Sequence, residues 1–310
     1  MKLALVFPGQ GSQSVGMLNE LAEEFTLVKD TFATASQVLG YDLWQVVSSG
    51  PEDKLNDTAT TQPAMLAAGV ATWRVWQAQQ GPQPAIMAGH SLGEYTALVC
   101  AGSIAFEDAI GLVADRGRFM QQAVPAGQGA MAAILGLSDD DVCQACADAA
   151  QGDIVSAVNF NSPGQVVIAG QAGAVERAVE AAKAKGAKRA VMLPVSVPSH
   201  CQLMEPAAQQ LGQRLNAIDI AAPSIPVLNN VDVQAAQEPA QIRDALMRQL
   251  YNPVRWVETI EQMKAQGVDT LIECGPGKVL AGLNKRIDRG MNAMAVYTPE
   301  TLEQALSALQ

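Results

Sequence analysis

The stretch from residue 85 to residue 101 constrains the fold of this chain more than any other. The apolar run Ala85–Ala88 predicts a buried strand, and Leu92–Ala101 predicts a helix. Only the turn Gly89-His90-Ser91-Leu92-Gly93 lies between them. A strand that passes into a helix through such a glycine-bounded turn indicates an α/β fold around a buried sheet.

Segments of the same kind lie on both sides of this turn. Further apolar runs predict buried strands at Lys2–Phe7, Ile225–Leu228 and Thr270–Ile272. Helical periodicity covers residues 17–39, 61–80, 106–123, 204–216, 239–250 and 255–265, and a short amphipathic helix ends the chain. We therefore predict one large α/β domain made of residues 1–125 and 196–310.

The pattern changes between residues 126 and 195. Strand patterns alternate with two helical segments in the order Gly129–Gly136, helix Ser138–Ala150, Val155–Phe160, Gln165–Ala169, helix Ala172–Lys185 and Arg189–Val195. This β-α-β-β-α-β order is that of a ferredoxin-like unit. The sequence therefore predicts that residues 126–195 form an inserted subdomain.

Composition excludes several classes of function. The chain has 310 residues, is 49% hydrophobic and carries a formal net charge of -11, which argues against general nucleic-acid binding. It has no run of roughly 18 uncharged apolar residues, so we expect no membrane span and a cytoplasmic protein. Cys143 and Cys146 form a CxxC without a second pair or a nearby histidine, so we expect no metal site.

Ser91 is the candidate nucleophile. It occupies the centre of a G-x-S-x-G pattern, and the predicted strand and helix on its two sides are the context that a nucleophile elbow requires. The helix start behind it supplies free amides and the positive end of the helix dipole. The alternative is a tight turn with a helix-capping serine.

A serine needs a base, and the chain has only His90 and His200 to offer. His90 adjoins Ser91 in the sharp turn, where neighbouring side chains diverge. His200 follows a predicted strand, so its loop can reach the elbow; the alternative is a surface histidine. No acid between Ser91 and His200 is an obvious triad member, which favours a dyad oriented by a backbone carbonyl. Cys201 lacks an elbow and is a weak candidate for a thiol nucleophile.

Two further features suit acyl transfer. The amide of Leu92 is one oxyanion donor by the geometry of an elbow, and the Gly9-Gln10-Gly11 loop is placed to supply the second. Arg116 lies in an otherwise apolar helical stretch, where a charge is costly unless it is paired. It either makes a surface salt bridge with Asp115 or Glu107, or holds a substrate carboxylate in two parallel hydrogen bonds.

Together these residues resemble the malonyl-CoA:acyl carrier protein transacylase family in its stand-alone bacterial form. The matching stretches run in order along nearly the whole chain: residues 7–13, Thr61-Gln62-Pro63-Ala64, Gly89-His90-Ser91-Leu92-Gly93-Glu94, Arg116-Gly117-Arg118, residues 159–165, Ser196-Val197-Pro198-Ser199-His200 and Glu273-Cys274-Gly275-Pro276-Gly277. In multidomain polyketide synthases the tetrapeptide ending at the histidine varies with acyl choice. Val197-Pro198-Ser199-His200 differs from the forms found there and looks like the stand-alone enzymes, so we expect malonyl.

The resemblance implies an α/β-hydrolase-like large domain with a ferredoxin-like insert. It implies ping-pong transfer of malonyl from coenzyme A to the phosphopantetheine thiol of acyl carrier protein, for fatty acid or polyketide synthesis, with malonyl-CoA as a substrate and no cofactor. The family's site residues correspond to Ser91 as nucleophile, His200 as base, Arg116 for the carboxylate, Gln10 and Leu92 for the oxyanion, the backbone carbonyl near Gln249 as the group that orients the histidine, and Gln62 and Asn161 as site lining.

Two rival functions share some of these features. A serine hydrolase would use the same Ser91 and His200, but it has no need for Arg116 and more often shows an acid late in the chain before its histidine. A non-catalytic carrier-protein docking module would form no covalent adduct with an acyl-CoA.

An acidic carrier protein and this acidic chain should repel each other at long range. Docking then requires a local basic patch. Two basic clusters stand out, Lys183, Lys185, Lys188 and Arg189, and Lys278, Lys285, Arg286 and Arg289. We predict that Lys188, Arg189, Lys285 and Arg286 contribute to docking; the alternative is that both clusters are solvated helix faces.

Overall fold

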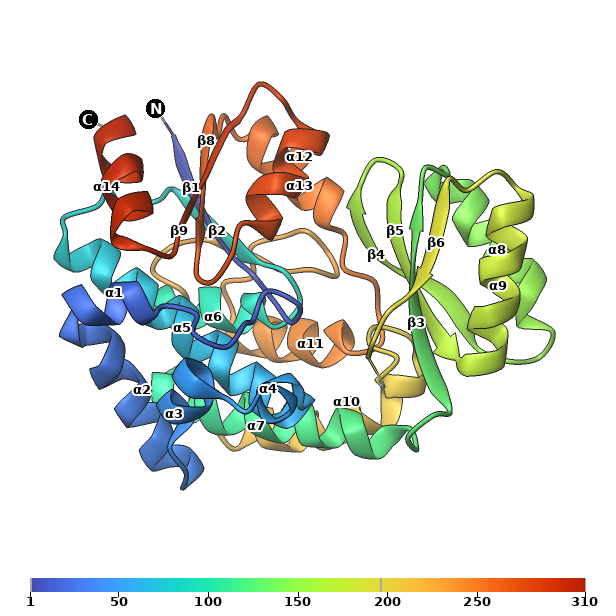
Figure 1. The fold of residues 1–310 in the computed structure, drawn as a ribbon, viewed down its shortest axis with the longest axis horizontal. Helices are drawn as coiled ribbons and strands as arrows, with labels where there is room; N and C mark the ends of the chain where they lie inside the picture. The colour runs from blue at the N-terminus through green and yellow to red at the C-terminus, as the bar shows by residue number, and fades with distance from the viewer. Residues whose placement is uncertain (1, 196, 310) are drawn as a thin grey trace.

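The computed structural model describes residues 2–195 and 197–309 and contains two separate sheets (Figure 1). The first is parallel and five-stranded, in the order β7-β2-β1-β8-β9, and the second is four-stranded, in the order β4-β5-β3-β6. In Figure 1 the first sheet stands among most of the helices, and the second lies to one side with two helices of its own. The predicted α/β class is confirmed.

The parallel sheet is built around β1 (Leu3–Phe7), which pairs with β2 (Ile86–Gly89) and β8 (Thr270–Cys274). The outer strands are β7 (Val227–Leu228) and β9 (Asn292–Val296). Every residue of β1 is buried. Alternate residues of β1 enter two different cores, one on each face of the sheet, because successive side chains of a strand point to opposite faces.

Helices cover both faces of this sheet. They are α1 (Asn19–Glu24), α2 (Thr26–Leu39), α3 (Leu43–Ser49), α4 (Glu52–Asn56), α5 (Thr58–Ala78), α6 (Gly93–Cys100), α7 (Phe106–Ala123), α10 (Glu205–Asn216), α11 (Pro239–Gln249), α12 (Trp256–Ala265), α13 (Val279–Ile287) and α14 (Pro299–Ala308), with a 3₁₀ turn, η1, at Gln202–Met204. The predicted helices are confirmed, although the one expected over residues 17–39 is broken at Phe25. Helices α3 and α4 and strand β9 were not predicted, because short elements carry little periodicity.

The second sheet has the predicted β-α-β-β-α-β order. It consists of β3 (Gly129–Leu135), α8 (Asp139–Ala150), β4 (Val155–Ser162), β5 (Gln165–Gln171), α9 (Ala172–Ala184) and β6 (Arg189–Met192). Both helices pack on one face of the antiparallel sheet. The last strand ends at Met192 rather than at the predicted Val195. The exact domain boundaries at residues 126 and 195 stay a prediction.

Each sheet and the helices packed on it form one unit, and main-chain hydrogen bonds join the two units. Phe160 in β4 donates its N–H to the carbonyl of Val254 at 3.0 Å, and Val254 donates to the carbonyl of Val158 at 2.8 Å. A side-chain bond of 2.7 Å from Arg286 to Gln165 adds to this connection. The strand that carries Asn161 is therefore held against the segment that follows α11.

Within the described residues, no helix is long and apolar enough to cross a membrane. The same part of the chain holds no group of three or more His, Cys, Asp or Glu side chains placed to bind a metal ion.

Candidate active site

The turn that carries Ser91 is packed too tightly for any residue but glycine on its two sides. A Cβ at Gly89 would lie 1.8 Å from the carbonyl carbon of Gly93, and a Cβ at Gly93 would lie 2.0 Å from the carbonyl oxygen of Phe7. Ser91 itself has a φ of 52°, in the left-handed region. Such a conformation costs about 1–3 kcal/mol in a residue with a side chain, and strain of this kind clusters at functional sites.

Ser91 and His200 meet across the sheet's carboxyl edge. The Oγ of Ser91 lies 2.8 Å from Nε2 of His200, and Nδ1 of His200 lies 2.7 Å from the backbone carbonyl of Gln249. A carbonyl can only accept, so Nδ1 carries the proton and Nε2 is free to take one from the serine. His200 is only 3% exposed, so it is not the surface histidine of the alternative interpretation.

His90 faces away from the nucleophile. Its Nε2 lies 2.8 Å from Oδ1 of Asn161, and its ring contacts that of Trp256 at a centroid distance of 5.5 Å. Asn161 comes from β4 of the second sheet, so this bond ties the elbow to that unit. The expected divergence of the His90 and Ser91 side chains is confirmed.

Arg116 is a buried cation without a carboxylate partner. It is 1% exposed, and no Asp or Glu oxygen of the described residues lies within 4 Å of its guanidinium. It donates to Oε1 of Gln62 at 2.8 Å and to Oε1 of Gln249 at 3.0 Å, and its Nη2 lies 3.4 Å from Oγ of Ser91.

The surface-salt-bridge alternative for Arg116 is wrong, because Asp115 pairs with Arg118 and Arg214 instead. Burial lowers the pKa of Arg116, but a guanidinium stays charged in proteins. A buried positive charge surrounded by neutral amides and beside the nucleophile is a binding position for an anion.

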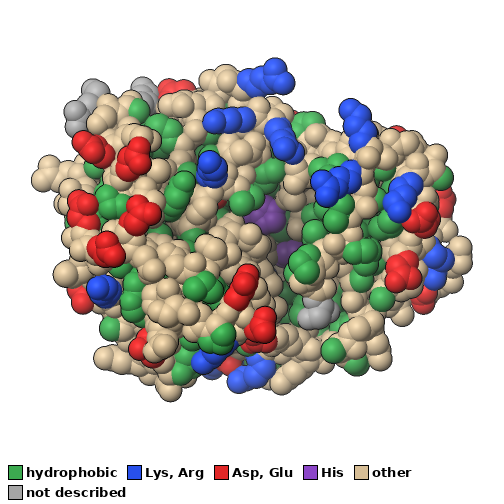
Figure 2. Space-filling model, viewed as in Figure 1, with side chains coloured by type: hydrophobic (Ala, Val, Ile, Leu, Met, Phe, Trp, Pro, Cys, Tyr) green, Lys and Arg blue, Asp and Glu red, His purple; other side chains and the backbone are tan. Residues whose placement is uncertain are grey.

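These groups open into a pocket of about 120 Å³ between the two units. Ser91, His200 and Arg116 all line it. The walls come from both units and include Gln10, Leu92, Met120, Met131, Asn159, Leu193, Val195 and Val197. Figure 2 shows the two histidines inside the hollow between the units.

Gln10 and Leu92 lie side by side at this pocket. A Cβ on Gly9 would lie 2.5 Å from the carbonyl oxygen of His90 and 3.8 Å from the amide nitrogen of Leu92, so the loop after β1 runs directly against the elbow. This places the backbone of Gln10 next to that of Leu92. Their role as oxyanion donors stays a prediction.

Behind the elbow, Asn230 and Glu94 were missed as site residues, and Gln249 was predicted only for its backbone carbonyl and not for its side chain. The backbone N–H of Ser91 donates a hydrogen bond of 2.7 Å to Oδ1 of Asn230. Nδ2 of Asn230 in turn donates to the carbonyl of Gly89 at 2.7 Å. The side chain of Gln249 contacts Arg116, the Ser91 carbonyl and Glu94. Asn230 follows a predicted strand of the parallel sheet, and this position was the available signal, since sites in such folds gather at the carboxyl ends of the strands.

The electrostatics of the pocket favour a neutral base. Burial, and then the positive charge of Arg116, lower the pKa of His200 to about 3. Burial raises the pKa of Glu94 to about 7, against the opposing effects of its hydrogen bonds and of Arg116. His200 is therefore unprotonated at neutral pH, as a general base must be before it acts.

Comparison with known proteins agrees with this geometry. Residues 4–298 match the family described as acyl transferase domain. A malonyl CoA-acyl carrier protein transacylase from Salmonella typhimurium is 60% identical over 99% of this chain and 99% of its own length. The one from Bacillus subtilis is 46% identical over 100% of this chain and 98% of its own.

Solved structures give the same result. An acyl carrier protein S-malonyltransferase from Vibrio cholerae superposes with a TM-score of 0.96 at 63% identity, covering 98% of this chain and 99% of that one. A malonyl-transacylase in complex with a type II polyketide synthase acyl carrier protein gives 0.98 at 59% identity, covering 99% and 100%. Fold and site thus define an acyl transferase. The chain belongs to the malonyl CoA-acyl carrier protein transacylase family.

The depressed pKa of His200 predicts an unusual pH profile. Acylation of Ser91 should change less than about threefold between pH 7.5 and pH 5.5, whereas a histidine with an ordinary pKa near 6.5 would lose about tenfold. Single-turnover acylation measured by quenched intact mass tests this, and a tenfold loss at pH 5.5 would contradict it.

The measurement must be fast, because the same shift acts on stability. The folded pKa lies below the unfolded one, so this histidine contributes stability above about pH 6.5 that is lost as the pH falls toward the folded value. A pH jump followed by quenching within seconds separates the rate from slow unfolding.

Proposed function

We propose that this chain moves a malonyl group from malonyl-CoA to the phosphopantetheine thiol of an acyl carrier protein through a malonyl ester on Ser91. The observation that carries the proposal is the buried guanidinium of Arg116, which has no carboxylate partner within 4 Å among the described residues and lies 3.4 Å from the serine oxygen. A free carboxylate on the acyl group would supply the missing counterion.

The first half-reaction acylates the serine. Nε2 of His200 takes the proton of Ser91 as Oγ attacks the thioester carbonyl, and the amides of Gln10 and Leu92, residues that both line the pocket, would donate to the resulting oxyanion. The carbon–sulfur bond then breaks, and the coenzyme A sulfur leaves with the proton held by His200. The carbonyl of Gln249 stabilises the protonated imidazole through Nδ1.

The second half-reaction reverses these roles. The carrier-protein thiol gives its proton to His200 and attacks the ester carbonyl, the bond from carbon to Oγ breaks, and Ser91 recovers its proton. In both halves Arg116 holds the malonyl carboxylate while Gln62 and Gln249 hold Arg116. Asn161 contributes by fixing His90 beside the elbow.

The proposal includes the wider setting of the reaction. The chemistry needs no metal or cofactor, and it supplies malonyl units for fatty acid or polyketide synthesis in the cytoplasm. We also propose that residues 1–125 and 196–310 form an α/β-hydrolase-like domain and residues 126–195 a ferredoxin-like one. The elbow connection and the order of the second sheet's elements support this description.

A covalent adduct tests the proposal directly. Mixing with malonyl-CoA should add one malonyl group, which peptide mapping should place on Ser91, and Ser91→Ala should abolish it. When holo acyl carrier protein is then added, the malonyl group should move from Ser91 to the carrier's thiol rather than be released by hydrolysis. An adduct on Cys201, or release only as free malonate, would reject the proposal.

Arg116 should decide which acyl groups are accepted. Arg116→Ala should slow malonyl transfer by roughly 30-fold or more, the effect of losing a charged hydrogen-bonding partner, and spare or raise acetyl transfer. Arg116→Lys should rescue poorly, because an ammonium lacks the planar fork. Rates of Ser91 acylation by malonyl-CoA and acetyl-CoA test this, and equal losses for both would contradict it.

Basic residues border the pocket mouth. Figure 2 shows Lys and Arg side chains gathered on one side of the hollow that holds the histidines. Arg189 begins β6 and Lys188 directly precedes it. Lys285 and Arg286 lie in the last turn of α13, and all four side chains are exposed. The bond from Arg286 to Gln165 brings the two clusters' units together. We propose that these four residues bind the acidic carrier protein.

Charge reversal tests this docking surface. Lys285→Glu with Arg286→Glu should raise the apparent KM for carrier protein and leave acylation by malonyl-CoA unchanged, with a defect that shrinks at high salt. Reversal of Lys29 and Lys54, exposed on α2 and α4, is the control with the same change in net charge. Equal effects of both pairs would place the docking surface elsewhere.

A further inference from the structure

A second buried charge lies behind the nucleophile and has no role in the reaction described above. Glu94, in the first turn of α6, is 2% exposed. Its Oε2 accepts from Nε2 of Gln249 at 2.8 Å and from the backbone N–H of Asn230 at 2.9 Å. In the described residues no cation forms an ion pair with it: its hydrogen bonds come from neutral N–H groups, and the charge of Arg116 acts on it only from a longer distance.

These contacts determine which way the amide of Gln249 points. Its Nε2 donates to Glu94 and to the carbonyl of Ser91, which leaves Oε1 directed at Arg116. If the amide were reversed, its oxygen would face the carboxylate and its NH₂ group would face the guanidinium. Both contacts would be repulsive, because a carboxylate only accepts and a guanidinium only donates.

The orientation of Gln249 in turn positions Arg116. Among the described residues the guanidinium donates to only two amide oxygens, those of Gln62 and Gln249, and its buried Nε has no hydrogen-bond partner there. The Gln249 bond acts on Nη2, the nitrogen that lies 3.4 Å from the serine oxygen. Without that bond the only hydrogen bond left to Nη2 among the described contacts is the one to the serine, while the ring of Tyr95, whose centroid lies 5.3 Å from the guanidinium carbon, contacts the group as a whole.

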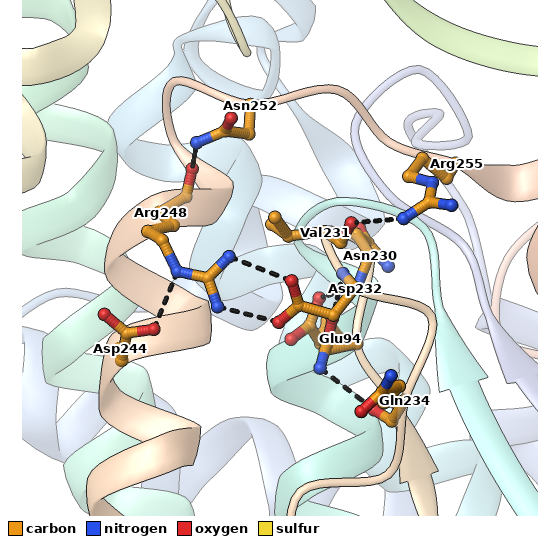
Figure 3. Close-up of polar contacts among 10 residues, drawn as sticks. Glu94, Asn230, Val231, Asp232, Gln234, Asp244, Arg248, Asn252 and Arg255 are labelled. Atoms are coloured by element: carbon orange, nitrogen blue, oxygen red, sulfur yellow. Dashed lines mark hydrogen bonds and ion pairs between the residues drawn. The ribbon is translucent and has the colours of Figure 1, made fainter.

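Glu94 also contacts the loop that supports the elbow. Asn230, whose main chain donates to Glu94, holds the amide of Ser91 with its side chain. Figure 3 shows how this loop is anchored from outside: Arg248 makes two hydrogen bonds to Asp232, and Arg255 donates to the carbonyl of Val231 at 3.0 Å. The loop at residues 230–232 is thus held by hydrogen bonds from Arg248 and Arg255 on one side and by a hydrogen bond to Glu94 on the other.

We propose that Glu94 is a positioning residue for acyl-group selectivity: by accepting from Gln249 it aims Arg116 at the carboxylate of the acyl group. The inference rests on the proposed malonyl transfer. It assigns Glu94 no contact with substrate, and it predicts that the residue's effect depends on whether the acyl group carries a carboxylate. A carboxylate that merely stabilises the fold would affect all acyl groups alike.

The test compares two substitutions of similar size. Glu94→Met fills the same space but accepts no hydrogen bond, whereas Glu94→Gln keeps an oxygen that can accept both N–H groups. For each variant, the rate of Ser91 acylation is measured by quenched intact mass with malonyl-CoA and with acetyl-CoA. Assays run at pH 8, above the pKa of about 7 of Glu94, so that the wild-type carboxylate is ionised.

We expect Glu94→Met to lower the malonyl-to-acetyl rate ratio by roughly 10- to 100-fold, the effect of one hydrogen bond to a charged group. Glu94→Gln should keep the ratio within about threefold of the wild type, because it keeps the acceptor. If Glu94→Met does not fold, Glu94→Asp serves instead, since its shorter side chain withdraws the oxygen from Gln249 and should also lower the ratio.

Glu273 provides the matched control. It is an equally buried carboxylate, 0% exposed, and burial raises its pKa to about 7 as well. It accepts from the amide of Ala281 at 2.9 Å at the start of α13 and touches neither Gln249 nor Arg116. Glu273→Met should lower the melting temperature as Glu94→Met does, but it should leave the malonyl-to-acetyl ratio at the wild-type value.

The outcomes separate this inference from the proposed function. If the wild-type protein forms no malonyl adduct, the proposed function itself is rejected. If the wild type forms the adduct and Glu94→Met lowers both rates equally, as a loss of stability would, only the role of Glu94 is rejected. A ratio in Glu94→Gln as low as in Glu94→Met would also overturn it, because the acceptor would then not be what matters.

Discussion

The site depends on one costly arrangement, a guanidinium buried beside Ser91 with no carboxylate of the described residues paired to it. Neutral amide oxygens of Gln62 and Gln249 supply hydrogen bonds to Arg116 but no full opposite charge. In the proposed reaction, an acyl group that brings its own carboxylate would relieve the cost of this charge, and this difference would be the source of selectivity. Burial, and after it this same charge, lower the pKa of His200 and so keep its imidazole unprotonated at neutral pH.

Gln249 connects the separate parts of the site. Its backbone carbonyl orients His200, while its side chain contacts Arg116, Glu94 and the carbonyl of Ser91. The residue lies at the end of α11, a few positions before the Val254 segment that pairs with β4. One short stretch of chain therefore contacts His200 and Arg116 and also joins the two units.

Local patterns were enough to predict much of the architecture. The elbow at Ser91 followed from a strand, a glycine-bounded turn and a helix within 17 residues, and the structure shows why both glycines are required. The βαββαβ order of the second sheet and the full extent of α7 were likewise predicted, because long periodic segments and clear turns are encoded locally. Strand β9 and helices α3 and α4 were missed because tertiary packing, rather than a local pattern, selects such short elements.

The candidate site shows the same division. The sequence by itself determined which side chains were available: one serine in an elbow, two histidines, and an arginine in an apolar helix. Only the tertiary structure decided that Arg116 has no ion partner in the part of the chain that is described, that Nε2 of His200 lies 2.8 Å from Oγ of Ser91, and that Glu94, Asn230 and Gln249 form one buried network. Residues 94, 230 and 249 are far apart along the chain, and burial leaves each polar group to be satisfied by whichever partner folding brings near. These partners cannot be predicted from a local sequence pattern, because the free-energy cost of leaving a polar group without a hydrogen bond arises only after folding has excluded water from it.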